Sequence, residues 1–472
     1  MAESLTPDLC IVGAGSAGLS LAAAGAQLGL EVVLIEAERM GGDCLNVGCV
    51  PSKALIAAAR TAQTMREAAR FGIAPVEPAV DVAAVMAHVR DVIAQIAPHD
   101  SVERFEALGV RVLRAHGRFT GPDELDAGGT RIRARRFVLA TGSRPAIPPV
   151  PGLAETVHLT NETLFELDEL PRHLLVLGGG PIGCEMAQAF RRLGAAVTLL
   201  DLGPILPRED PELVQILRDR LVAEGIKLHE RVKVTRAGPG PRLEFERDGA
   251  AQTVEGSHLL VATGRKVAVD GLGLDAAGVA HGPQGIRVDE RLRTSNRRVW
   301  AIGDCTGGPQ FTHMAGHHAA VVVRNALFRL PAKVERRAVP RVTYTDPELA
   351  QVGLQEGDDA ARGPGIEIIR LPLAENDRAR AERRSDGMVK LVVGRRGRVL
   401  GASVLGAHAG ELLLPWVLAV RDGLPLSRIA ATIAPYPTLA ETARQAAGKY
   451  FAPRLFAPRT RAIVRLLSRL GT

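Results

Sequence analysis

The feature that most restricts the fold of this chain is a Gly-rich segment that occurs twice. In the first copy, the apolar residues 9–12 precede GAGSAG, which contains Gly13, Gly15 and Gly18, and a helix-forming run follows. A second apolar stretch then ends at Glu36. This order predicts strand, tight turn, helix, strand and acid. Such glycines let the backbone approach a pyrophosphate at a helix N-terminus, and the acid can accept a hydrogen bond from a ribose hydroxyl. The segment therefore predicts a βαβ unit that binds a dinucleotide.

The second copy has the same internal spacing. The apolar residues 174–177 precede GGGPIG, which contains Gly178, Gly180 and Gly183, and the next apolar stretch ends at Asp201. In both copies the acid lies 23 positions after the first glycine. Two such copies predict two dinucleotide sites in one chain.

The acid of the second copy also bears on which cofactor binds there. A carboxylate at Asp201 repels the 2′-phosphate of NADPH, so we expect NADH to be favoured over NADPH. Arg208 lies close in the sequence and could attract that phosphate, which leaves NADPH as the alternative.

Two of the five cysteines, Cys44 and Cys49, lie in GGDCLNVGCVPSK at residues 41–53. In a continuous helix, Cα atoms five residues apart are separated by roughly 8 Å, whereas a disulfide needs roughly 4.4–6.8 Å. Pairing therefore requires a local distortion, which Gly48 and Pro51 permit. A strained bond in a short loop is easily reduced, as a redox site requires. Two buried cysteines in a Gly-rich loop are the alternative.

The bulk composition limits the class of protein. A chain of 472 residues is too long for one core. Only 3% of its residues are aromatic, so few side chains could stack on bases. We therefore do not expect nucleic-acid binding, despite the formal charge of +7. We see no secretory signal and no apolar run of transmembrane length. The other cysteines are scattered and form no secreted disulfide framework, so we predict a cytoplasmic protein; they are Cys10, Cys184 and Cys305.

Two further turns resemble each other. Residues 140–145 read ATGSRP and residues 262–265 read ATGR, and each follows a predicted strand. We interpret Thr141, Gly142 and Gly264 as marking the ends of the two nucleotide-binding units.

TSNRRVWAIGD, at residues 294–304, predicts a strand that ends in Gly303 and Asp304. An Asp at the carboxyl end of a sheet strand is placed to bind a ribityl or ribose hydroxyl, although an ordinary turn Asp is the simpler alternative. Three histidines follow on a predicted helix without an accompanying Cys or carboxylate signature, so we predict no metal site there; they are His313, His317 and His318.

The character of the sequence changes near residue 339. Short predicted strands alternate with helical runs, and no nucleotide motif occurs, which predicts a separate α+β domain. PYPT at residues 435–438 is predicted to open the last long helix. The run 459–470 has Arg four residues apart and apolar residues opposite. We expect this basic amphipathic helix to dock on the protein or on a partner subunit, with a membrane surface as the alternative.

GGDCLNVGCVPSK, the doubled GxGxxG, TSNRRVWAIGD and the closing PYPTLAE together resemble the flavin-dependent pyridine nucleotide–disulfide oxidoreductases. That family includes dihydrolipoamide dehydrogenase, glutathione reductase and mercuric reductase. The resemblance covers nearly the whole chain. It implies an α/β fold with two Rossmann-type domains, FAD on the first and NAD(P)H on the second, and a C-terminal α+β domain that dimerises. The implied bounds are 1–150 and 270–337 for FAD, 151–269 for NAD(P) and 338–472 for the interface.

The resemblance also implies roles for individual residues. Cys49 would lie against the flavin, and Cys44 would be the more exposed thiol that exchanges with substrate. Lys53 would sit beside the reactive flavin nitrogen and pair with Glu185. The implied FAD contacts come from both ends of the first fold: Gly13, Gly15, Gly18, Glu36, Gly42, Lys53, Thr141, Gly142, Gly303 and Asp304. The implied NAD(P) contacts are Gly178, Gly180, Gly183, Asp201 and Gly264.

One position departs from the disulfide-reducing members. Their closing motif begins with a His that is oriented by a Glu and serves as the acid–base group for thiol exchange. Here Tyr436 stands in that place, while Glu441 remains. Tyr titrates near pH 10 and is a poor proton shuttle at neutral pH. Mercuric reductases resemble this chain in having Tyr here, but they carry a C-terminal cysteine pair that SRLGT lacks.

We therefore expect a homodimeric FAD enzyme in which the partner's C-terminal domain completes the active site. Three acceptors compete: a small-molecule disulfide such as lipoamide, a metal ion (mercuric or copper), and a quinone or dye. The dihydrolipoyl dehydrogenase-like reaction on a disulfide is the first choice, and metal-ion reduction is the alternative. A flavin-bearing redox sensor is the non-enzyme alternative.

Overall fold

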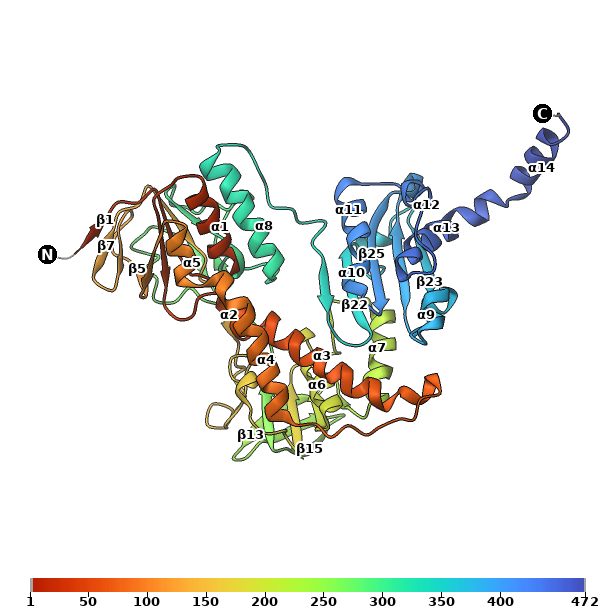
Figure 1. Ribbon diagram of the computed structural model, residues 1–472, viewed down its shortest axis with the longest axis horizontal. Coiled ribbons are helices and arrows are strands. Elements are labelled where there is room, and N and C mark those ends of the chain that lie inside the picture. The colour runs from red at the N-terminus through yellow and green to blue at the C-terminus, as the bar shows by residue number, and fades with distance from the viewer. Residues whose placement is uncertain (1–2, 471–472) are drawn as a thin grey trace.

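The structure is a computed structural model that describes residues 3–470. Figure 1 shows three bodies, each built on its own main sheet. The first parallel sheet lies at the left beneath α1 (Ser16–Gln27) and α8 (Thr312–Val322), the second lies at the bottom, and an antiparallel sheet lies at the right. The α/β class with two parallel-sheet folds and a C-terminal α+β body is confirmed.

The first sheet has five parallel strands in the order β20-β8-β2-β3-β4. Every residue of the central strand β2 is buried, and its side chains alternate between two cores. Leu9 and Ile11 pack toward α1 and α8, whereas Cys10 and Val12 pack on the opposite face. A strand covered on both faces is apolar throughout. The strands are β2 Leu9–Val12, β3 Val32–Glu36, β4 Val110–Arg114, β8 Arg136–Leu139 and β20 Val299–Ala301.

Segments distant in sequence complete this sheet. β20 comes after the whole second fold in the sequence, yet it joins this sheet by pairing in parallel with β8. The acid-bearing turn after β20 is thereby brought to the same edge as the Gly-rich turn after β2, because the carboxyl ends of parallel strands share one edge. The domain bounds inferred from the sequence stay a prediction.

The second sheet repeats the plan with four parallel strands in the order β12-β11-β10-β16. The helix α6 (Pro181–Leu193) follows β10, as α1 follows β2. The repeat extends to a close backbone contact. A Cβ at Gly13 would lie 2.4 Å from the Ala140 carbonyl oxygen, and one at Gly178 would lie 2.4 Å from the Ala262 carbonyl oxygen. The strands are β10 His173–Leu177, β11 Ala196–Leu200, β12 Lys227–His229 and β16 His258–Val261.

The two ATG segments lead into a direct link between these folds. β9 (Ser143–Pro145) and β17 (Arg265–Val267) pair antiparallel. Two small antiparallel sheets flank the parallel ones; their strands are β1 Ser4–Leu5, β5 Gly117–Phe119, β6 Leu125–Ala127 and β7 Thr130–Ile132, and β13 Lys233–Gly238, β14 Arg242–Arg247 and β15 Ala250–Glu255. A hairpin joins β18 (His281–Gly282) to β19 (Gly285–Ile286).

The C-terminal body is a five-stranded antiparallel sheet in the order β21-β22-β25-β24-β23. Its strands are β21 Arg341–Thr343, β22 Glu348–Gly353, β23 Glu367–Pro372, β24 Met388–Val393 and β25 Val399–Gly406. Trp416 and Tyr450, from two of its helices, are buried in its core. Its helices are α9 Asp377–Ala381, α10 Ala409–Leu412, α11 Leu414–Asp422, α12 Leu426–Ala430, α13 Thr442–Leu455 and α14 Pro458–Leu467.

The remaining helices are α2 Gly42–Asn46, α3 Cys49–Arg66, α4 Val82–Ile96, α5 Val102–Ala107 and α7 Pro211–Ala223. Among the described residues, no helix has the length and apolar character needed to cross a membrane.

The predicted start of the last long helix is confirmed. PYPT is followed directly by a 3-10 turn, Leu439–Glu441, which continues into α13 at Thr442. The Thr438 hydroxyl caps that turn by accepting from the Glu441 N–H at 3.3 Å. The prolines that precede Thr438 keep the chain from becoming helical earlier.

Candidate active site

The two cysteines lie on separate helices. Cys44 lies within α2, and Cys49 is the first residue of α3. The helical path is interrupted at Gly48, where the backbone passes so close to Asp43 that a Cβ would lie 2.7 Å from its carboxylate oxygen. Pro51 falls in the first turn of α3, where a missing N–H costs no hydrogen bond. The distortion expected from the Cys spacing is therefore present.

Both cysteines are free thiols in this structure. The hydrogen bond between the two thiols, together with burial and the charge of Cys49, raises the pKa of Cys44. The same hydrogen bond lowers the pKa of Cys49 to about 6 against the opposing effect of burial, and Thr312 and Lys53 assist. The start of α3 adds a helix N-terminus, which also favours a thiolate. Cys49 is thus the thiolate of the pair at neutral pH.

The two thiols have different surroundings. In the single chain Cys49 is exposed and Cys44 is half-buried; which thiol exchanges with substrate stays a prediction. The difference in exposure has a local cause. Cys44 packs inside α2 against the start of α1, where Ser16 hydrogen-bonds to it, whereas Cys49 opens α3 beside the Thr312 hydroxyl at 3.3 Å.

The predicted Lys53–Glu185 pair forms. The Lys53 ammonium donates to Glu185 Oε2 at 2.9 Å, across the contact between α3 and α6. Glu185 Oε1 accepts from the Tyr344 N–H at 2.9 Å, and Lys53 Nζ lies 4.3 Å from the centroid of the Tyr344 ring. The nearly buried Glu185 side chain is fixed by these two donors, so it holds the ammonium close to Cys49. Lys53 in turn helps lower the pKa of Cys49.

The first Gly-rich turn fits a dinucleotide. Gly15 and Gly42 face each other so closely that a Cβ on Gly42 would lie 2.7 Å from the Gly15 Cα. Glu36 ends β3 and binds two backbone N–H groups, those of Ala14 at 2.6 Å and Glu38 at 2.7 Å. The turn therefore presents bare backbone and an acidic side chain at the N-terminus of α1, which fits the FAD expected there.

Asp304 lies in the short turn after β20 and is half-buried. Its Oδ2 accepts from the Ser143 hydroxyl at 2.7 Å, and burial raises the pKa of its carboxyl group. Thr141 and Gly142 lie in the neighbouring turn after β8, where the Thr141 hydroxyl donates to the Ala268 carbonyl at 2.6 Å. Glu36 and Asp304 thus flank the first Gly-rich turn at the carboxyl edge of one sheet, as an FAD site requires.

The second Gly-rich turn has the same design. Asp201 follows β11 and accepts from the Gly179 N–H at 2.5 Å and the Gly203 N–H at 2.6 Å. Gly178, Gly180 and Gly183 lead into α6, and Gly264 lies in the turn after β16. The structure thus places all five predicted NAD(P) residues at one sheet edge; their roles stay predictions.

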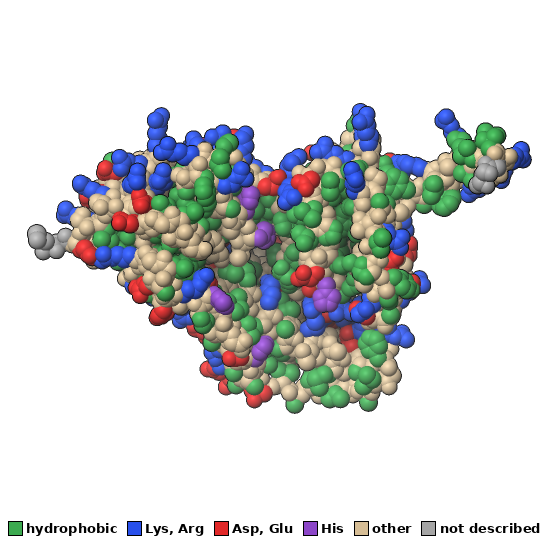
Figure 2. Space-filling model, turned by 45° about the horizontal axis from the view of Figure 1, so that its top comes forward, with side chains coloured by type: hydrophobic (Ala, Val, Ile, Leu, Met, Phe, Trp, Pro, Cys, Tyr) green, Lys and Arg blue, Asp and Glu red, His purple; other side chains and the backbone are tan. Residues whose placement is uncertain are grey.

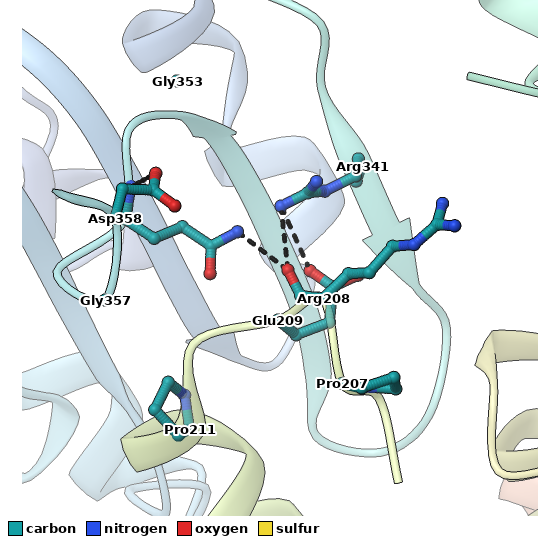
Figure 3. Close-up of a pocket in the computed structure, with 9 residues that line it drawn as sticks. Pro207, Arg208, Glu209, Pro211, Arg341, Gly353, Gly357 and Asp358 are labelled. Atoms are coloured by element: carbon teal, nitrogen blue, oxygen red, sulfur yellow. Dashed lines mark hydrogen bonds and ion pairs between the residues drawn. The ribbon is translucent and has the colours of Figure 1, made fainter. Parts of the chain in front are cut away.

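Arg208 takes part in a different contact. It lines a pocket of about 440 Å³ between the loop after β11 and the C-terminal sheet (Figure 3). Its carbonyl oxygen accepts from Arg341 at 3.2 Å and from the Gln355 amide at 2.9 Å. Glu209 beside it pairs with Arg341 at 3.6 Å, and burial raises the pKa of the Glu209 carboxyl group.

The three histidines of α8 serve the backbone. His318 Nδ1 accepts from the Gly303 N–H at 3.1 Å, His317 Nε2 accepts from the Glu335 N–H at 2.9 Å, and His313 Nε2 lies 2.9 Å from the Pro340 carbonyl oxygen. Within residues 3–470, no cluster of three or more His, Cys, Asp or Glu side chains is arranged to hold a metal ion.

Tyr436 and Glu441 are not brought together. The Tyr436 hydroxyl donates to Asp377 at 3.2 Å, which raises its pKa, and the side chain is 69% exposed. Glu441 is buried and pairs instead with Arg444 at 2.5 Å. Both residues lie between α12 and α13, away from α2 (Figure 1). Within one chain they do not form a site with the cysteines.

Several residues that shape the site had no sequence signal. A polar chain runs from Asn161 to Asp43 at 3.0 Å, from Asp43 to Arg265 at 3.0 Å, and from Arg265 to the Ser143 hydroxyl at 2.8 Å. Ser143 in turn binds Asp304. These contacts join segments more than a hundred positions apart, and Thr312 lies 263 positions from Cys49. Only the folded chain reveals them.

Comparison with known proteins agrees with this geometry. Residues 7–319 match the family described as pyridine nucleotide-disulphide oxidoreductase, and residues 339–447 match its dimerisation domain. A mercuric reductase of Streptomyces lividans is 38% identical over 453 residues, covering 93% of this chain and 95% of the relative. A dihydrolipoyl dehydrogenase of Thermus scotoductus is 36% identical over 457 residues, covering 94% and 97%.

Solved structures agree as well. A Cu(II) complex of the HOCl-induced flavoprotein disulfide reductase RclA from Escherichia coli matches with a TM-score of 0.83 and 28% identity, covering 93% of this chain and 98% of that one. LpdA from Mycobacterium tuberculosis matches with a TM-score of 0.85 and 29% identity, covering 96% and 100%. With its paired cysteines, two dinucleotide folds and matching dimerisation domain, the chain belongs to the FAD-dependent pyridine nucleotide-disulphide oxidoreductases.

Proposed function

We propose that this enzyme uses reduced pyridine nucleotide to keep Cys44 and Cys49 as a dithiol, and that the dithiol serves the reduction of a thiophilic metal ion. The observation that carries the proposal is the asymmetric pair itself. Cys49, with a pKa of about 6, is ionised at neutral pH and pairs with a second thiol on the preceding short helix. Thiolates are the ligands that soft metal ions prefer.

Gly13, Gly15, Glu36 and Asp304 would hold FAD, which would supply the means to pass the electron pair of reduced nicotinamide to the Cys44–Cys49 disulfide. The chain's own groups then set the protonation states. Cys49 is released as a thiolate, because the Cys44 hydrogen bond, Thr312 and Lys53 stabilise its charge. Cys44 takes up one proton, since its pKa is raised. Glu185 keeps the Lys53 ammonium in place beside them.

Tyr436 favours a metal ion over a disulfide as the acceptor. Reduction of a disulfide releases a thiolate that must be protonated, whereas a metal ion bound by two sulfurs needs no proton donor. Binding of such an ion releases the Cys44 proton to solvent. Tyr436 has a pKa raised above that of an ordinary tyrosine by Asp377, which makes it a weaker acid. The Streptomyces lividans relative is a mercuric reductase, which supports the same acceptor class.

A small-molecule disulfide is the second candidate. The low pKa of Cys49 suits it to attack a substrate S–S bond, forming a mixed disulfide that the other cysteine resolves to regenerate Cys44–Cys49. The Thermus scotoductus relative is a dihydrolipoyl dehydrogenase, which supports this reaction. Quinone reduction and a sensor role have no further support in the site.

We infer that NADH is the preferred electron donor. Asp201 holds two backbone N–H groups at the end of β11, so its carboxylate is fixed where a 2′-phosphate would bind. Arg208, the residue that argues for NADPH, binds Arg341 and Gln355 of the C-terminal part through its backbone carbonyl, so its guanidinium keeps NADPH as the alternative (Figure 3).

We further infer a homodimer whose partner completes the site. The match to a dimerisation domain supports two subunits, and exposed Tyr436 is accessible to a second chain. This arrangement is the reason that Tyr436 and Glu441 need not approach the cysteines of their own chain.

Steady-state NADH consumption tests the acceptor. We expect Hg(II) to give a kcat/KM at least about tenfold above that of lipoamide or glutathione disulfide, and Cys49→Ser to abolish turnover of all three. Tyr436→His is the discriminating variant, because it restores an acid–base group. It should raise disulfide turnover on the order of 100-fold and give no such gain with Hg(II). Faster disulfide than metal turnover in the unmodified enzyme would favour the second candidate.

A further inference from the structure

The C-terminal helix α14 stands apart from the body. It begins at Pro458, after α13 has packed Tyr450 into the C-terminal core, and it projects from the molecule at the upper right of Figure 1. None of its described residues is buried. The expectation that this helix docks on its own chain is therefore wrong for the single subunit.

The two faces of α14 differ. Arg461 and Arg465 lie four residues apart on one face, and Arg469 follows the helix at the same spacing. Arg459 falls in the first turn, on the other side. Apolar and basic side chains are both exposed on the projecting segment (Figure 2). The apolar residues of the helix are each about half exposed or more: Ile463 49%, Val464 58%, Leu466 61% and Leu467 59%; Leu470, just beyond the helix, is 71% exposed.

The charge of this segment has one sign. No Asp or Glu occurs after Glu441 in the sequence. The basic residues of α13 have partners in the body: Lys449 pairs with Glu375 and Arg454 with Glu367. Among the described residues, no carboxylate lies within ion-pair distance of the arginines of α14.

The helix also lies outside the family's shared domain. The match to the dimerisation domain ends at residue 447, eleven residues before Pro458. The subunit contact implied by that match therefore does not call for α14. Packing of α14 on α14 of a second copy through the apolar residues would leave both rows of arginines without a counter-charge.

We propose that α14 binds the surface of an anionic phospholipid bilayer. An amphipathic helix with a basic face lies in the interfacial plane, with its apolar side chains among the acyl chains and its arginines at the headgroups. Charge complementarity favours an anionic bilayer, because the segment has an apolar stripe and a row of unpaired cations but no acid. Such a bilayer offers acyl chains to the apolar side chains and negatively charged headgroups to the arginines. The enzyme would then be held at a membrane surface by its tail, while its catalytic bodies stay in water.

Flotation of the FAD-loaded enzyme with vesicles tests this proposal. We expect the enzyme to float with vesicles of phosphatidylglycerol and phosphatidylcholine and not with phosphatidylcholine alone. Replacing Arg461, Arg465 and Arg469 by Gln should weaken partitioning on the order of 100-fold, since each basic residue near such a surface contributes about fivefold. Ile463→Ser with Leu467→Ser should also abolish flotation, because the apolar face is lost.

A matched variant controls for net charge. Arg297, Arg324 and Arg396 are exposed on the body, and replacing them by Gln removes the same charge without touching α14. This control should float like the unmodified enzyme, and all variants should keep NADH-dependent turnover and bound FAD. Equal loss of flotation in the control, or no flotation on anionic vesicles, would overturn the proposal. So would a helix-dependent increase in oligomer size without lipid, which would assign α14 to a second copy.

Discussion

Cys49 owes its reactivity to its position at the start of a helix and beside a second thiol. Four groups surround it: Cys44, Thr312, Lys53 and Asp43. The first three favour the thiolate, whereas burial and the Asp43 carboxylate oppose it. The balance is a pKa of about 6, which leaves the thiol ionised across the neutral range. The segment GGDCLNVGCVPSK contains Asp43, Cys44 and Lys53, whereas the contact with Thr312 comes from folding.

The rate of alkylation of the reduced enzyme by iodoacetamide reports this pKa. We expect the rate to rise with pH through a midpoint near 6, because only the thiolate reacts. Cys44→Ala removes the hydrogen bond that lowers this pKa most, so the midpoint should move up toward the ordinary value of about 8.5. Cys44→Ser, which retains a donor, should fall between. A midpoint that does not change in either variant would contradict this account of the site.

His318 is a buried neutral histidine that supports the Asp304 turn. Burial, with the charges of His317 and Arg336, lowers the pKa of His318 to about 4. Its Nδ1 accepts from Gly303, which only the neutral ring can do. The unfolded chain binds a proton at this histidine below about pH 6.5, while the folded chain resists until about pH 4. Stability from this group is thus complete above pH 6.5 and is lost as the pH falls toward 4.

Urea unfolding at several pH values tests that contribution. Between pH 7 and pH 4 we expect the unmodified enzyme to lose about 3 kcal/mol of unfolding free energy through His318 alone. His318→Asn keeps an acceptor for the Gly303 N–H but cannot titrate. The pH dependence of its stability should therefore be shallower by that amount. Identical slopes in both proteins would show that His318 is not the titrating group.

At the scale of elements, one buried cation connects two bodies. Lys390 on β24 reaches Asp210, the N-cap of α7, with both carboxylate oxygens at 2.9 Å. Glu212 and Glu356 lie 2.5 and 2.6 Å from the same ammonium. Lys390 and Asp210 are almost completely buried. A buried charge whose partner is removed is costly, so this contact resists separation of the second nucleotide fold from the C-terminal sheet.

Lys390→Met tests the contact. The variant leaves carboxylates without their cation and should lower the free energy of unfolding by about 3–5 kcal/mol. Lys449→Met is the matched control, because Lys449 pairs with Glu375 on the surface and both are well exposed. Its loss should cost less than about 1 kcal/mol. Similar destabilisation in both variants would show that the buried ion pair contributes no more to the free energy of unfolding than the surface pair does.

The elements that the sequence predicted best are those whose turns require glycine. The first strand was predicted at residues 9–12 and β2 is Leu9–Val12. This fully buried strand is a short apolar run bounded by turn residues, so pattern alone finds it.

No sequence pattern indicates β22, although this strand lies between β21 and β25. Its residues ELAQVG include Glu348 and Gln351, which are buried. Glu348 lies 3.4 Å from Arg60, and the Gln351 amide lies 3.0 Å from the Ser403 hydroxyl. Because these polar side chains are satisfied by partners far along the chain, the strand lacks the apolar alternation that identifies one. Arg265 and Thr312 were not predicted as site residues for the same reason, because their partners lie far along the chain.

At the scale of the whole molecule, the site is an assembly of distant segments. The redox pair comes from α2 and α3, its hydroxyl neighbour from α8, and the Lys53 partner from α6 of the second fold. Tyr344, which anchors Glu185, belongs to the segment after β21 of the C-terminal sheet. All three bodies of Figure 1 therefore contribute to one centre. A change in their relative placement would act on Cys49 through Lys53.

Anaerobic titration of the oxidised enzyme with NADH tests the central claim that Cys44 and Cys49 receive electrons within this enzyme. We expect about two equivalents of NADH per FAD to be consumed, one for the flavin and one for the disulfide, with a long-wavelength band from the Cys49 thiolate beside the flavin. Cys49→Ser should consume about one equivalent and show no band. Consumption of one equivalent by the unmodified enzyme, or a band that survives in Cys49→Ser, would contradict the assignment.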